Sequence, residues 1–393
     1  MNMNNKNWVS VWGNAVSIAE HHPEAYAKYI TLRYPVYIPF AGDTLRFTFD
    51  NYCGSEAVTV TRATVSAATS PVYEKMPLAC PCKKETICDI TFSKNESVTM
   101  EAHQTAVSDP VSFPVKKGMT LTVSLYFADF TLMQSAVLVT GPLSKGFFSL
   151  GDQTHADALP MDTTKITNWF YFLSNIELMT AEENHTVICY GDSITAGAWP
   201  DYLTLLARQN PDNHTSFIRR ATSGSRVLRQ YECITYDSYG LKGTNRFPHE
   251  IPTTGADTVI IQQGINDIIH PVGIETNPFR PMSDLPTAKE LIDGYRYYIE
   301  EAKKSHLKVY MGTLLPIFGW RTYATFRDDL RNELNAWIRS AKEIDGCIDF
   351  DLALRGSENP SAFREGFDSG DHLHPSSKAY QAMAECAYEV LQR

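Results

Sequence analysis

In the first half of the chain, short segments alternate between hydrophobic and polar residues. The clearest of these segments are residues 44–49, 57–61 and 119–127, where β-branched and aromatic side chains take many positions. A period of two residues is typical of antiparallel strands that bury one face. Because Gly, Pro and Asn separate such segments over residues 8–175, we predict an antiparallel β-sandwich with half-buried strands.

The pattern changes in the second half. Short continuous hydrophobic runs, typical of parallel strands buried on both faces, occur at residues 186–190, 258–262, 307–315 and 347–350. A further strand is predicted at residues 215–220. Helical periodicity occurs at residues 199–208, 286–304, 323–342 and 375–391. The alternation predicts a parallel sheet covered by helices, with ligands at the carboxyl ends of the strands.

A polar stretch at residues 181–185 separates the two patterns. The chain has 393 residues, which exceeds the roughly 100 to 200 residues of one domain. We therefore predict a jelly-roll-like β-sandwich accessory domain over residues 1–183 and a catalytic α/β domain over residues 184–393. In the predicted helix 286–304, one face carries Leu291, Tyr295, Tyr298, Ile299 and Ala302.

Composition narrows the class of protein. Hydrophobic residues make up 43% of the chain and charged residues 20%, which is typical of a globular protein with a substantial core. The chain has 35 Lys and Arg against 45 Asp and Glu, and its net charge is −10. Because such a field repels phosphate backbones and anionic lipids, we expect neither a nucleic-acid partner nor a membrane partner.

Eight cysteines are too few, in a chain of this length, for a disulfide-stabilised scaffold. Cys80, Cys82 and Cys88 are close enough in sequence to suggest a metal site or a disulfide, but this spacing lacks a second pair of ligands. We expect a reduced loop and no metal.

Residues 1–8 are rich in Asn and lack the hydrophobic segment of a signal peptide. No run approaches the roughly 18 hydrophobic residues that a membrane span needs. These features predict a cytoplasmic protein. A mature secreted chain from which the signal has been removed is the alternative.

A serine follows the first hydrophobic run of the second half. In the sequence Gly-Asp-Ser-Ile-Thr at residues 191–195, Ser193 falls at a strand-to-helix turn, where its hydroxyl and its N–H lie near a helix N-terminus. That position suits a nucleophile. The alternative is an ordinary serine N-cap.

Two further strand ends carry residues suited to binding an oxyanion. Gly224, after the predicted strand 215–220, allows close approach of the backbone to a ligand, although it is also a common turn residue. Asn266, after the strand 258–262, offers a side-chain N–H or caps its own loop. We expect the adjacent Asp267 to brace this loop rather than transfer a proton.

The last motif precedes the final helix. The spacing of Asp371 and His374 lets the carboxylate fold back onto the imidazole ring, and Pro375 suits the first helical position. Histidine is the side chain whose pKa lies near working pH. His372 is a competing base, which would need Asp368 or Asp371 as its partner.

Together, the four blocks resemble those of the SGNH (GDSL-type) hydrolase superfamily: Gly-Asp-Ser, a Gly, Gly-x-Asn-Asp and Asp-x-x-His, in this order over residues 186–391. The resemblance implies a flavodoxin-like parallel sheet. It also implies Ser193 as nucleophile, His374 as general base and Asp371 as its orienting carboxylate. The oxyanion hole would comprise the N–H groups of Ser193 and Gly224 and the Asn266 side chain. The Gly-x-Ser-x-Gly elbow of α/β-hydrolases is missing around Ser193.

The segments 226–255 and 268–285 leave strand ends that border this site. Tyr231, Tyr236, Tyr239 and Arg246 are expected to line it and to suit a sugar ring, or else the tyrosines pack within a surface loop. The first half loosely resembles β-sandwich domains that precede some bacterial SGNH esterases, including carbohydrate esterases.

The leading hypothesis is a serine esterase that needs no cofactor. It would remove a short acyl group, in the first instance acetyl, from an O-acetylated oligosaccharide. The alternatives are a lipase, lysophospholipase or thioesterase of the same superfamily, and a carbohydrate-binding protein without turnover. The oligomeric state stays open.

Overall fold

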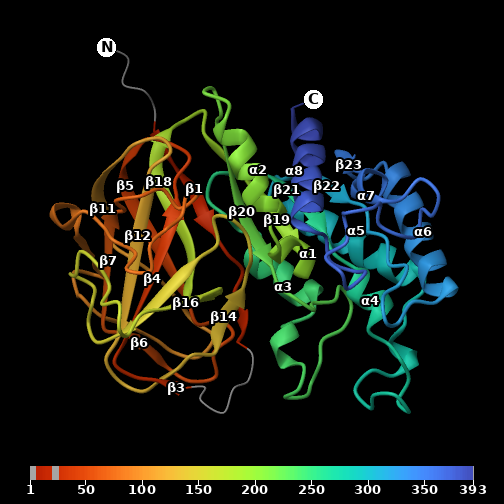
Figure 1. The fold of residues 1–393 in the computed structure, drawn as a ribbon, viewed down its shortest axis with the longest axis horizontal. Coiled ribbons are helices and arrows are strands. Elements are labelled where there is room, and N and C mark those ends of the chain that lie inside the picture. The colour runs from red at the N-terminus through yellow and green to blue at the C-terminus, as the bar shows by residue number, and fades with distance from the viewer. Residues whose placement is uncertain (1–5, 20–25, 393) are drawn as a thin grey trace. The chain divides into compact units, whose positions relative to one another are not determined.

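The computed structural model describes residues 6–19 and 26–392. Two compact units divide the chain (Figure 1). The first contains Met1–Thr186 and Pro211–Ile218, and the second contains Val187–Asn210 and Arg219–Arg393. Residues 1–5 lie outside the described residues, and they make up most of the segment 1–8 in which we looked for a signal peptide.

The first unit contains two larger antiparallel sheets, as the alternating pattern predicts. One sheet has the order β1 (Lys6–Gly13), β18 (Leu173–Ala181), β5 (Gly42–Asp50), β10 (Thr105–Val107), and β11 (Val111–Val115) also pairs with β5. The other has the order β16 (Lys165–Thr167), β15 (Gly146–Leu150), β4 (Ile30–Tyr37), β12 (Thr120–Phe127), β7 (Arg62–Ala67), β8 (Cys88–Ile90).

Among its described residues, the first unit also contains three smaller sheets and one short helix. The smaller sheets are β13 (Thr131–Leu132) with β3 (Tyr26–Ala27), β6 (Val58–Val60) with β9 (Val98–Met100), and β17 (Trp169–Tyr171), β14 (Ser135–Leu138), β2 (Ser17–Ile18). The 3-10 helix η1 spans Lys84–Thr86.

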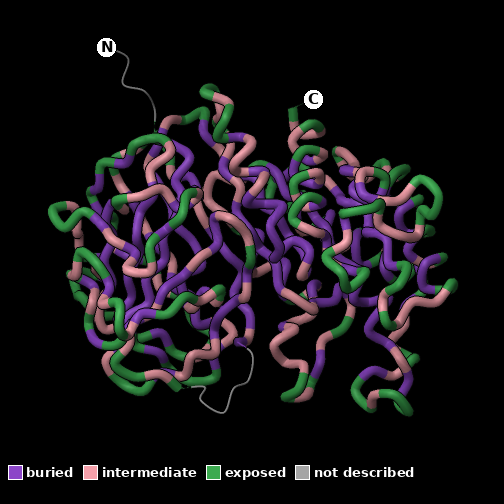
Figure 2. The backbone as a smooth tube through the Cα atoms, viewed as in Figure 1, coloured by how far each residue is buried: buried purple, intermediate pink, exposed green. Residues whose placement is uncertain are grey.

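Strands β5 and β12 differ in how they are buried. Over most of its length β5 alternates between buried and partly exposed residues, as predicted. All eight residues of β12 are buried, so the expectation of one solvent face is wrong there. Figure 2 shows buried residues concentrated in the strands and exposed ones in the connecting loops.

The polar face of β12 is buried because loops from distant parts of the chain cover it. Arg33 of the neighbouring strand β4 donates to Ser124 on β12. The same guanidinium donates to the carbonyls of Cys80, Gln153 and Ala156. A buried arginine therefore fixes two loops over the sheet, and no local sequence pattern records these long-range contacts.

The cysteine loop is part of this cover. All eight cysteines are free thiols. Burial raises the pKa of the Cys80 thiol to about 12, against the opposing effect of Arg33. Such a thiol stays protonated, which suits packing rather than reactivity.

A five-stranded sheet, formed mostly by residues of the second unit, has the order β20 (Thr215–Ala221), β19 (His185–Gly191), β21 (Ala256–Gln262), β22 (Lys308–Gly312), β23 (Gly346–Ile348). In order along the chain, this is 2-1-3-4-5, the flavodoxin-like arrangement. The pairs β21–β22 and β22–β23 are parallel. The predicted α/β fold class is therefore confirmed.

The helices of the second unit pack in two groups. Helices α2 (Trp199–Arg208) and α7 (Phe350–Leu354) both contact α8 (Ser377–Leu391). Helix α5 (Ala288–Lys304) contacts both α3 (Gly243–Glu250) and α6 (Thr325–Ser340), and α6 also contacts α4 (Ile265–Ile269). The short elements are α1 (Ser193–Ala196), η2 (Asp237–Tyr239) and η3 (Met282–Asp284).

Helix ends follow their capping chemistry. Helix α5 begins after Thr287, which forms a capping box with Glu290, and the five residues of its predicted apolar face are all buried. Helix α8 begins at Ser377, with Ser376 as its N-cap. The prediction that Pro375 is the first helical residue is therefore wrong. Pro375 forms an isolated β-bridge with Asp368 instead.

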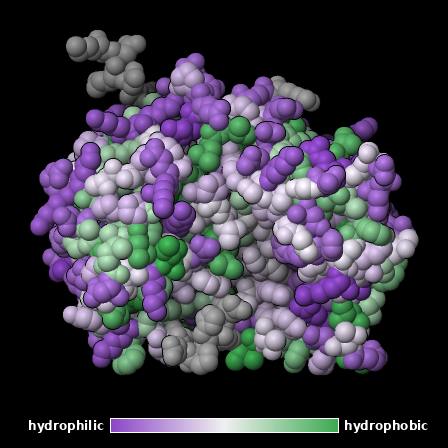
Figure 3. All heavy atoms as spheres, viewed as in Figure 1, coloured by the Kyte–Doolittle hydropathy of each residue, from purple (hydrophilic) through white to green (hydrophobic). Residues whose placement is uncertain are grey.

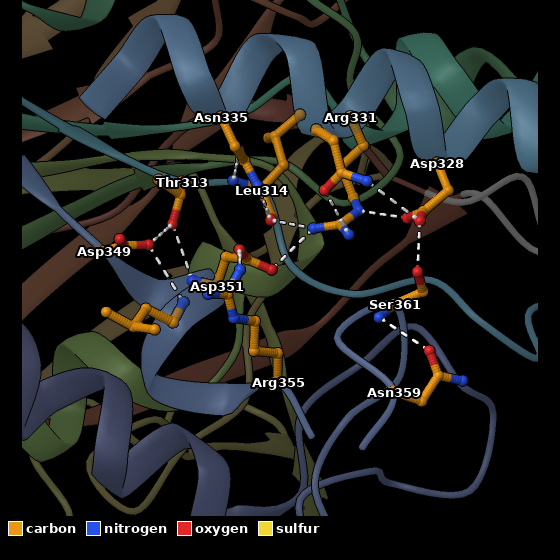
Figure 4. Close-up of polar contacts among 12 residues, drawn as sticks. Thr313, Leu314, Asp328, Arg331, Asn335, Asp349, Asp351, Arg355, Asn359 and Ser361 are labelled. Atoms are coloured by element: carbon orange, nitrogen blue, oxygen red, sulfur yellow. Dashed lines mark hydrogen bonds and ion pairs between the residues drawn. The ribbon is translucent and has the colours of Figure 1, made fainter. Parts of the chain in front are cut away.

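A buried ionic network joins the strand ends on the β23 side (Figure 4). Arg331 on α6 donates to Asp328 at 2.7 Å and to Asp351 on α7 at 2.8 Å. Asp328 also accepts a hydrogen bond from Ser361, in the segment that leads to α8. Since buried charges are stable only when paired, this network fixes helices and loop together.

Within the described residues, no helix has the length and hydrophobicity to cross a membrane. On the face shown in Figure 3, hydrophilic residues predominate and hydrophobic residues form small separate groups.

Candidate active site

Ser193 lies at the first position of α1, and Asp192 alone separates it from the end of β19. The N-cap is Asp192, whose side chain accepts a hydrogen bond from the N–H of Ile194 at 3.0 Å. The capping role that a serine often has is therefore taken by the preceding residue. This leaves the Ser193 hydroxyl available for another partner.

The turn before Ser193 is close-packed. A Cβ on Gly191 would lie 2.3 Å from the carbonyl oxygen of Gln262, so no side chain fits there. The Gly191 carbonyl accepts a hydrogen bond from Arg246 at 2.9 Å. Arg246 is buried and also pairs with Glu250, so our prediction that it lines the substrate site is wrong. Its hydrogen bond to the Gly191 carbonyl holds the turn that precedes Ser193 instead.

Ser193, His374 and Asp371 are brought together from two distant segments. The Nε2 atom of His374 lies 2.9 Å from the Ser193 hydroxyl, and its Nδ1 lies 2.6 Å from Oδ2 of Asp371. A carboxylate only accepts hydrogen bonds, so Nδ1 carries the proton and Nε2 is left to accept from the serine. The arrangement can pass the serine proton to the imidazole.

Asp371 is held by several donors. Its Oδ1 atom accepts from the N–H groups of Leu373 and His374, at 3.0 and 2.8 Å, and from the Ser369 hydroxyl. Burial favours the protonated acid, but the hydrogen bonds from His374 and from the backbone outweigh it and lower the pKa of Asp371 to about 2. The group is therefore a carboxylate at neutral pH.

His372 has a carboxylate partner of its own. Its Nδ1 atom lies 2.5 Å from Asp368, and its ring packs against Gly319. Its backbone is in the left-handed region, with φ of 66°. The side chain is 52% exposed, and the histidine that contacts Ser193 is His374.

The two predicted oxyanion loops contact each other. Gly224 has φ of 77°, a conformation that favours glycine. The Asn266 side chain donates to the carbonyl of Ser225 at 3.0 Å, which leaves one of its N–H groups for another acceptor. Asp267 accepts hydrogen bonds from the N–H groups of Val227 and Leu228, so it braces both loops.

Sequence reasoning missed how deeply the acids near Ser193 are buried. Asp192 is fully buried, and burial raises its pKa to about 7. Its Oδ2 atom has no hydrogen-bond partner among the described residues. Burial also raises the pKa of Asp267 to about 6, although the N–H groups of Val227 and Leu228 oppose the shift. Only the position of Asp192 in the Gly-Asp-Ser block drew attention to it.

The three predicted tyrosines gather between two loops, which extend on the same side of the second unit in Figure 1. Tyr231, Tyr236 and Tyr239 have ring centroids 4.8 to 5.7 Å apart. The Tyr239 ring packs against Gly224 and stacks on His270 at 5.2 Å. Asn277 of the second loop donates to the Tyr236 hydroxyl. The tyrosines therefore join the loops beside Gly224.

No cluster of three or more His, Cys, Asp or Glu side chains suited to a metal ion occurs in the part of the chain that the structure describes.

Residues 189–382 match the model of the GDSL-like lipase/acylhydrolase family. No curated protein sequence matches the chain. A GDSL-like lipase from Bacteroides thetaiotaomicron is similar in structure, with 20% identity, a TM-score of 0.40, and coverage of 54% of this chain and 89% of its own.

Two other similar structures carry names that refer to carbohydrate esters. A carbohydrate esterase family 3 protein from Talaromyces cellulolyticus has 16% identity and a TM-score of 0.36, and covers 53% of this chain and 96% of its own. A catalytic mutant of an acetylxylan esterase from Geobacillus stearothermophilus has 15% identity and a TM-score of 0.38, and covers 52% of this chain and 93% of its own.

Proposed function

Because residues 189–382 belong to the GDSL-like lipase/acylhydrolase family of the SGNH superfamily, we propose that this protein is a serine esterase acting on a carbohydrate. It removes a short acyl group, in the first instance acetyl. The observation that carries the proposal is the continuous chain of contacts from Ser193 through His374 to Asp371.

The first half of the reaction forms an acyl-enzyme. The Ser193 oxygen attacks the ester carbonyl carbon while His374 Nε2 takes its proton. When the tetrahedral intermediate collapses, the carbon–oxygen bond to the alcohol breaks, and His374 returns the proton to the leaving oxygen. Asp371 stays ionised and stabilises the imidazolium that forms between these two transfers.

The second half restores the serine. Water gives a proton to His374 as its oxygen attacks the acyl carbon, and collapse of this intermediate releases the acid. Ser193 then regains its proton from His374. No group outside the protein, the ester and water is needed to balance either half.

In this proposal the oxyanion accepts hydrogen bonds from the N–H groups of Ser193 and Gly224 and from the Asn266 side chain. The remaining N–H of Asn266 and the left-handed conformation of Gly224 support these roles. Donors already fixed before the reaction stabilise the developing charge without reorganisation. The contact between Asn266 and Ser225 supplies that fixation.

Aromatic residues beside the proposed oxyanion position support a compact sugar substrate. The Tyr239 ring packs directly on Gly224, so an aromatic wall borders the place where the ester carbonyl would bind. Binding sites for small molecules combine such walls with a few polar groups.

A hydrolase for longer acyl chains is the second candidate, because four apolar side chains are exposed on the same two loops. Ile234 is 71% exposed, and the others are Ile274, Phe279 and Met282. Side chains of this kind favour contact with an acyl chain. The carbohydrate-binding alternative is less favoured, since a protein without turnover gains nothing from the Ser193–His374–Asp371 contacts.

The test is the hydrolysis rate of a chromogenic ester series from acetyl to octanoyl, with acetylated oligosaccharides alongside. We expect acetyl to react fastest and acetate to be released from sugar. Ser193→Ala should lower kcat/KM at least ~10³-fold. Rates that rise with chain length would favour the second candidate, and full activity of Ser193→Ala would contradict the mechanism.

A further inference from the structure

Arg280 is a buried arginine that lies on the tyrosine cluster. The residue is 7% exposed, and its guanidinium lies 4.3 Å from the ring centroid of Tyr236. The rings of Tyr231 and Tyr239 are 5.8 and 6.0 Å away. Contacts with aromatic faces stabilise a cation only in part. The protein has therefore buried a positive charge here without an anion beside it.

Other buried arginines show how unusual this is. The structure records eight buried arginines, and seven of them donate to a carboxylate or a carbonyl group. These seven are Arg33, Arg219, Arg220, Arg226, Arg246, Arg327 and Arg331. Among the described residues, the Arg280 side chain has no hydrogen-bond or ion-pair partner, and its Nε atom is enclosed. An unpaired buried charge is strongly unfavourable unless another group compensates it.

Unpaired polar atoms recur in the same cluster. The Tyr231 hydroxyl and the Nδ1 atom of His270 are both buried without a hydrogen-bond partner in the described chain. Both rings are close together, with centroids 5.9 Å apart. Native proteins leave few such atoms unsatisfied. Three of them in one cluster indicate that a bound group completes it.

The cluster adjoins both proposed oxyanion loops. Tyr239, whose ring lies near Arg280, packs on Gly224. His270 is the C-cap of α4, and its N–H donates to the carbonyl of Asn266. A substrate whose ester carbonyl reaches these loops would therefore have its neighbouring part close to the tyrosine cluster.

We propose that Arg280 binds a carboxylate of the substrate, so that the preferred esters are those of acidic sugars. The planar guanidinium matches a carboxylate through two parallel hydrogen bonds. This assignment rests on the esterase function proposed above and adds the chemical class of its substrate.

The local charge favours a singly charged group. Arg226, the other arginine on Tyr231, is already paired with Asp284 at 3.1 Å. Burial and the nearby arginines lower the pKa of His270, so this ring is neutral. Arg280 thus contributes one positive charge without a paired anion, and a single carboxylate neutralises it.

The first test compares two acetyl esters that differ in one group, an acetylated glucuronic acid and the matching acetylated glucose. For the wild type, kcat/KM should be higher for the acidic ester. Arg280→Gln should lower that value by about 10- to 100-fold, mainly through an increase in KM, and should lower kcat/KM for the neutral ester by a clearly smaller factor. Arg280→Lys should recover part of the loss because it keeps the charge. Equal effects on both esters would overturn the assignment.

A matched control and a fold check accompany these variants. Arg229 belongs to the facing segment 226–255, is half exposed, and lies 3.5 Å from Asp284, in the same segment as Arg280. Arg229→Gln removes a positive charge nearby and should leave the preference for the acidic ester unchanged. The melting temperature of Arg280→Gln should equal or exceed that of the wild type, since the substitution removes an unpaired buried charge. A loss of preference in Arg229→Gln would mean that overall charge, not Arg280, selects the substrate.

A binding measurement separates this proposal from the esterase function. Calorimetric titration of Ser193→Ala with glucuronate should show binding, and the double variant Ser193→Ala/Arg280→Gln should show none. Glucose should bind to Ser193→Ala at least ~10-fold more weakly than glucuronate. Sulfate and phosphate serve as further ligands, and tighter binding of either would overturn the choice of a carboxylate. If no ester is hydrolysed but glucuronate binds through Arg280, the esterase function fails and the anion site stands. If esters are hydrolysed and glucuronate binding does not depend on Arg280, the anion site fails alone.

Discussion

Two polar clusters of the second unit differ in how completely their groups are paired. Around Arg331, the guanidinium contacts Asp328 and Asp351, and Ser361 donates to Asp328 (Figure 4). Around Ser193, the His374 side chain is 34% exposed and Oδ2 of Asp192 has no partner among the described residues. Complete pairing is what a structural network needs, whereas a catalytic site keeps donors and acceptors for its substrate. Changes in the two clusters should therefore affect different properties.

The largest effect is expected from His374→Gln, which removes the base but fits the same space. Esterase kcat should fall by about 10⁴-fold or more, because Ser193 loses its proton acceptor. The melting temperature should change little, since the ring is partly exposed. Steady-state kinetics and thermal unfolding on the same sample measure both.

The matched control is His372→Gln. His372 also has an aspartate partner, Asp368, but the histidine in contact with Ser193 is His374. Activity within about threefold of the wild type is expected. A loss as large as that of His374→Gln would mean that the wrong histidine has been assigned.

The opposite result is expected from Arg331→Ala. Removing the cation leaves the buried Asp328 without its arginine and takes one of three arginine partners from Asp351, which lowers the free energy of unfolding by about 3–5 kcal/mol. Below the lowered melting temperature, kcat per folded molecule should stay near the wild-type value. Urea unfolding measures the loss, and a loss below about 1 kcal/mol would show that this network is not structural.

Asn266→Ala should lower kcat by about 10²- to 10³-fold with KM nearly unchanged, because in the proposed mechanism the second amide N–H contacts the substrate only when the oxyanion forms. The substitution also removes the hydrogen bond to Ser225, so its melting temperature should be measured. Asn266→Asp, which has the same size but no amide donor, is the control. Activity of Asn266→Asp close to that of the wild type would exclude the oxyanion role.

The smallest effect concerns pH and stability at Asp192. Burial raises its pKa from 3.8 to about 7, so the folded protein favours the protonated acid. This contribution to stability is fully present below pH 3.8 and is lost as the pH rises through about 7. Asp192→Asn keeps a side chain that caps α1 but does not titrate.

The free energy of unfolding of Asp192→Asn should therefore fall less between pH 4 and pH 8 than that of the wild type. Asp267, whose pKa is raised to about 6, titrates in the same range, so part of the dependence should remain. Denaturant unfolding at several pH values measures the difference. Identical pH dependence in both proteins would show that Asp192 is ionised in the folded state.

Much of the fold could be predicted from local patterns. Helix α2 has the predicted bounds, and the apolar face of α5 is buried, because helical periodicity reflects burial directly. The two-sided burial of β12 could not be predicted, because Arg33 binds the covering loops through carbonyl groups far away in sequence.

In the candidate site too, local motifs could be predicted from the sequence and long-range contacts could not. Contiguous motifs identified Ser193, Asp371 and His374, which the structure brings together. Arg246 was expected at the substrate because its segment follows a strand end, but its position in α3 directs it to the buried carbonyl of Gly191. Arg280 could not be identified from the sequence, because its aromatic contacts come from the other segment, 226–255, and an unpaired charge is visible only in three dimensions.

The central claim is that Ser193 is a nucleophile activated by His374. The most direct test is labelling with a fluorophosphonate, followed by mass spectrometry of the peptides. The account predicts one label on Ser193 in the wild type and none in Ser193→Ala, and labelling at least ~10³-fold slower in His374→Gln. No label on Ser193, or equal labelling in His374→Gln, would contradict it.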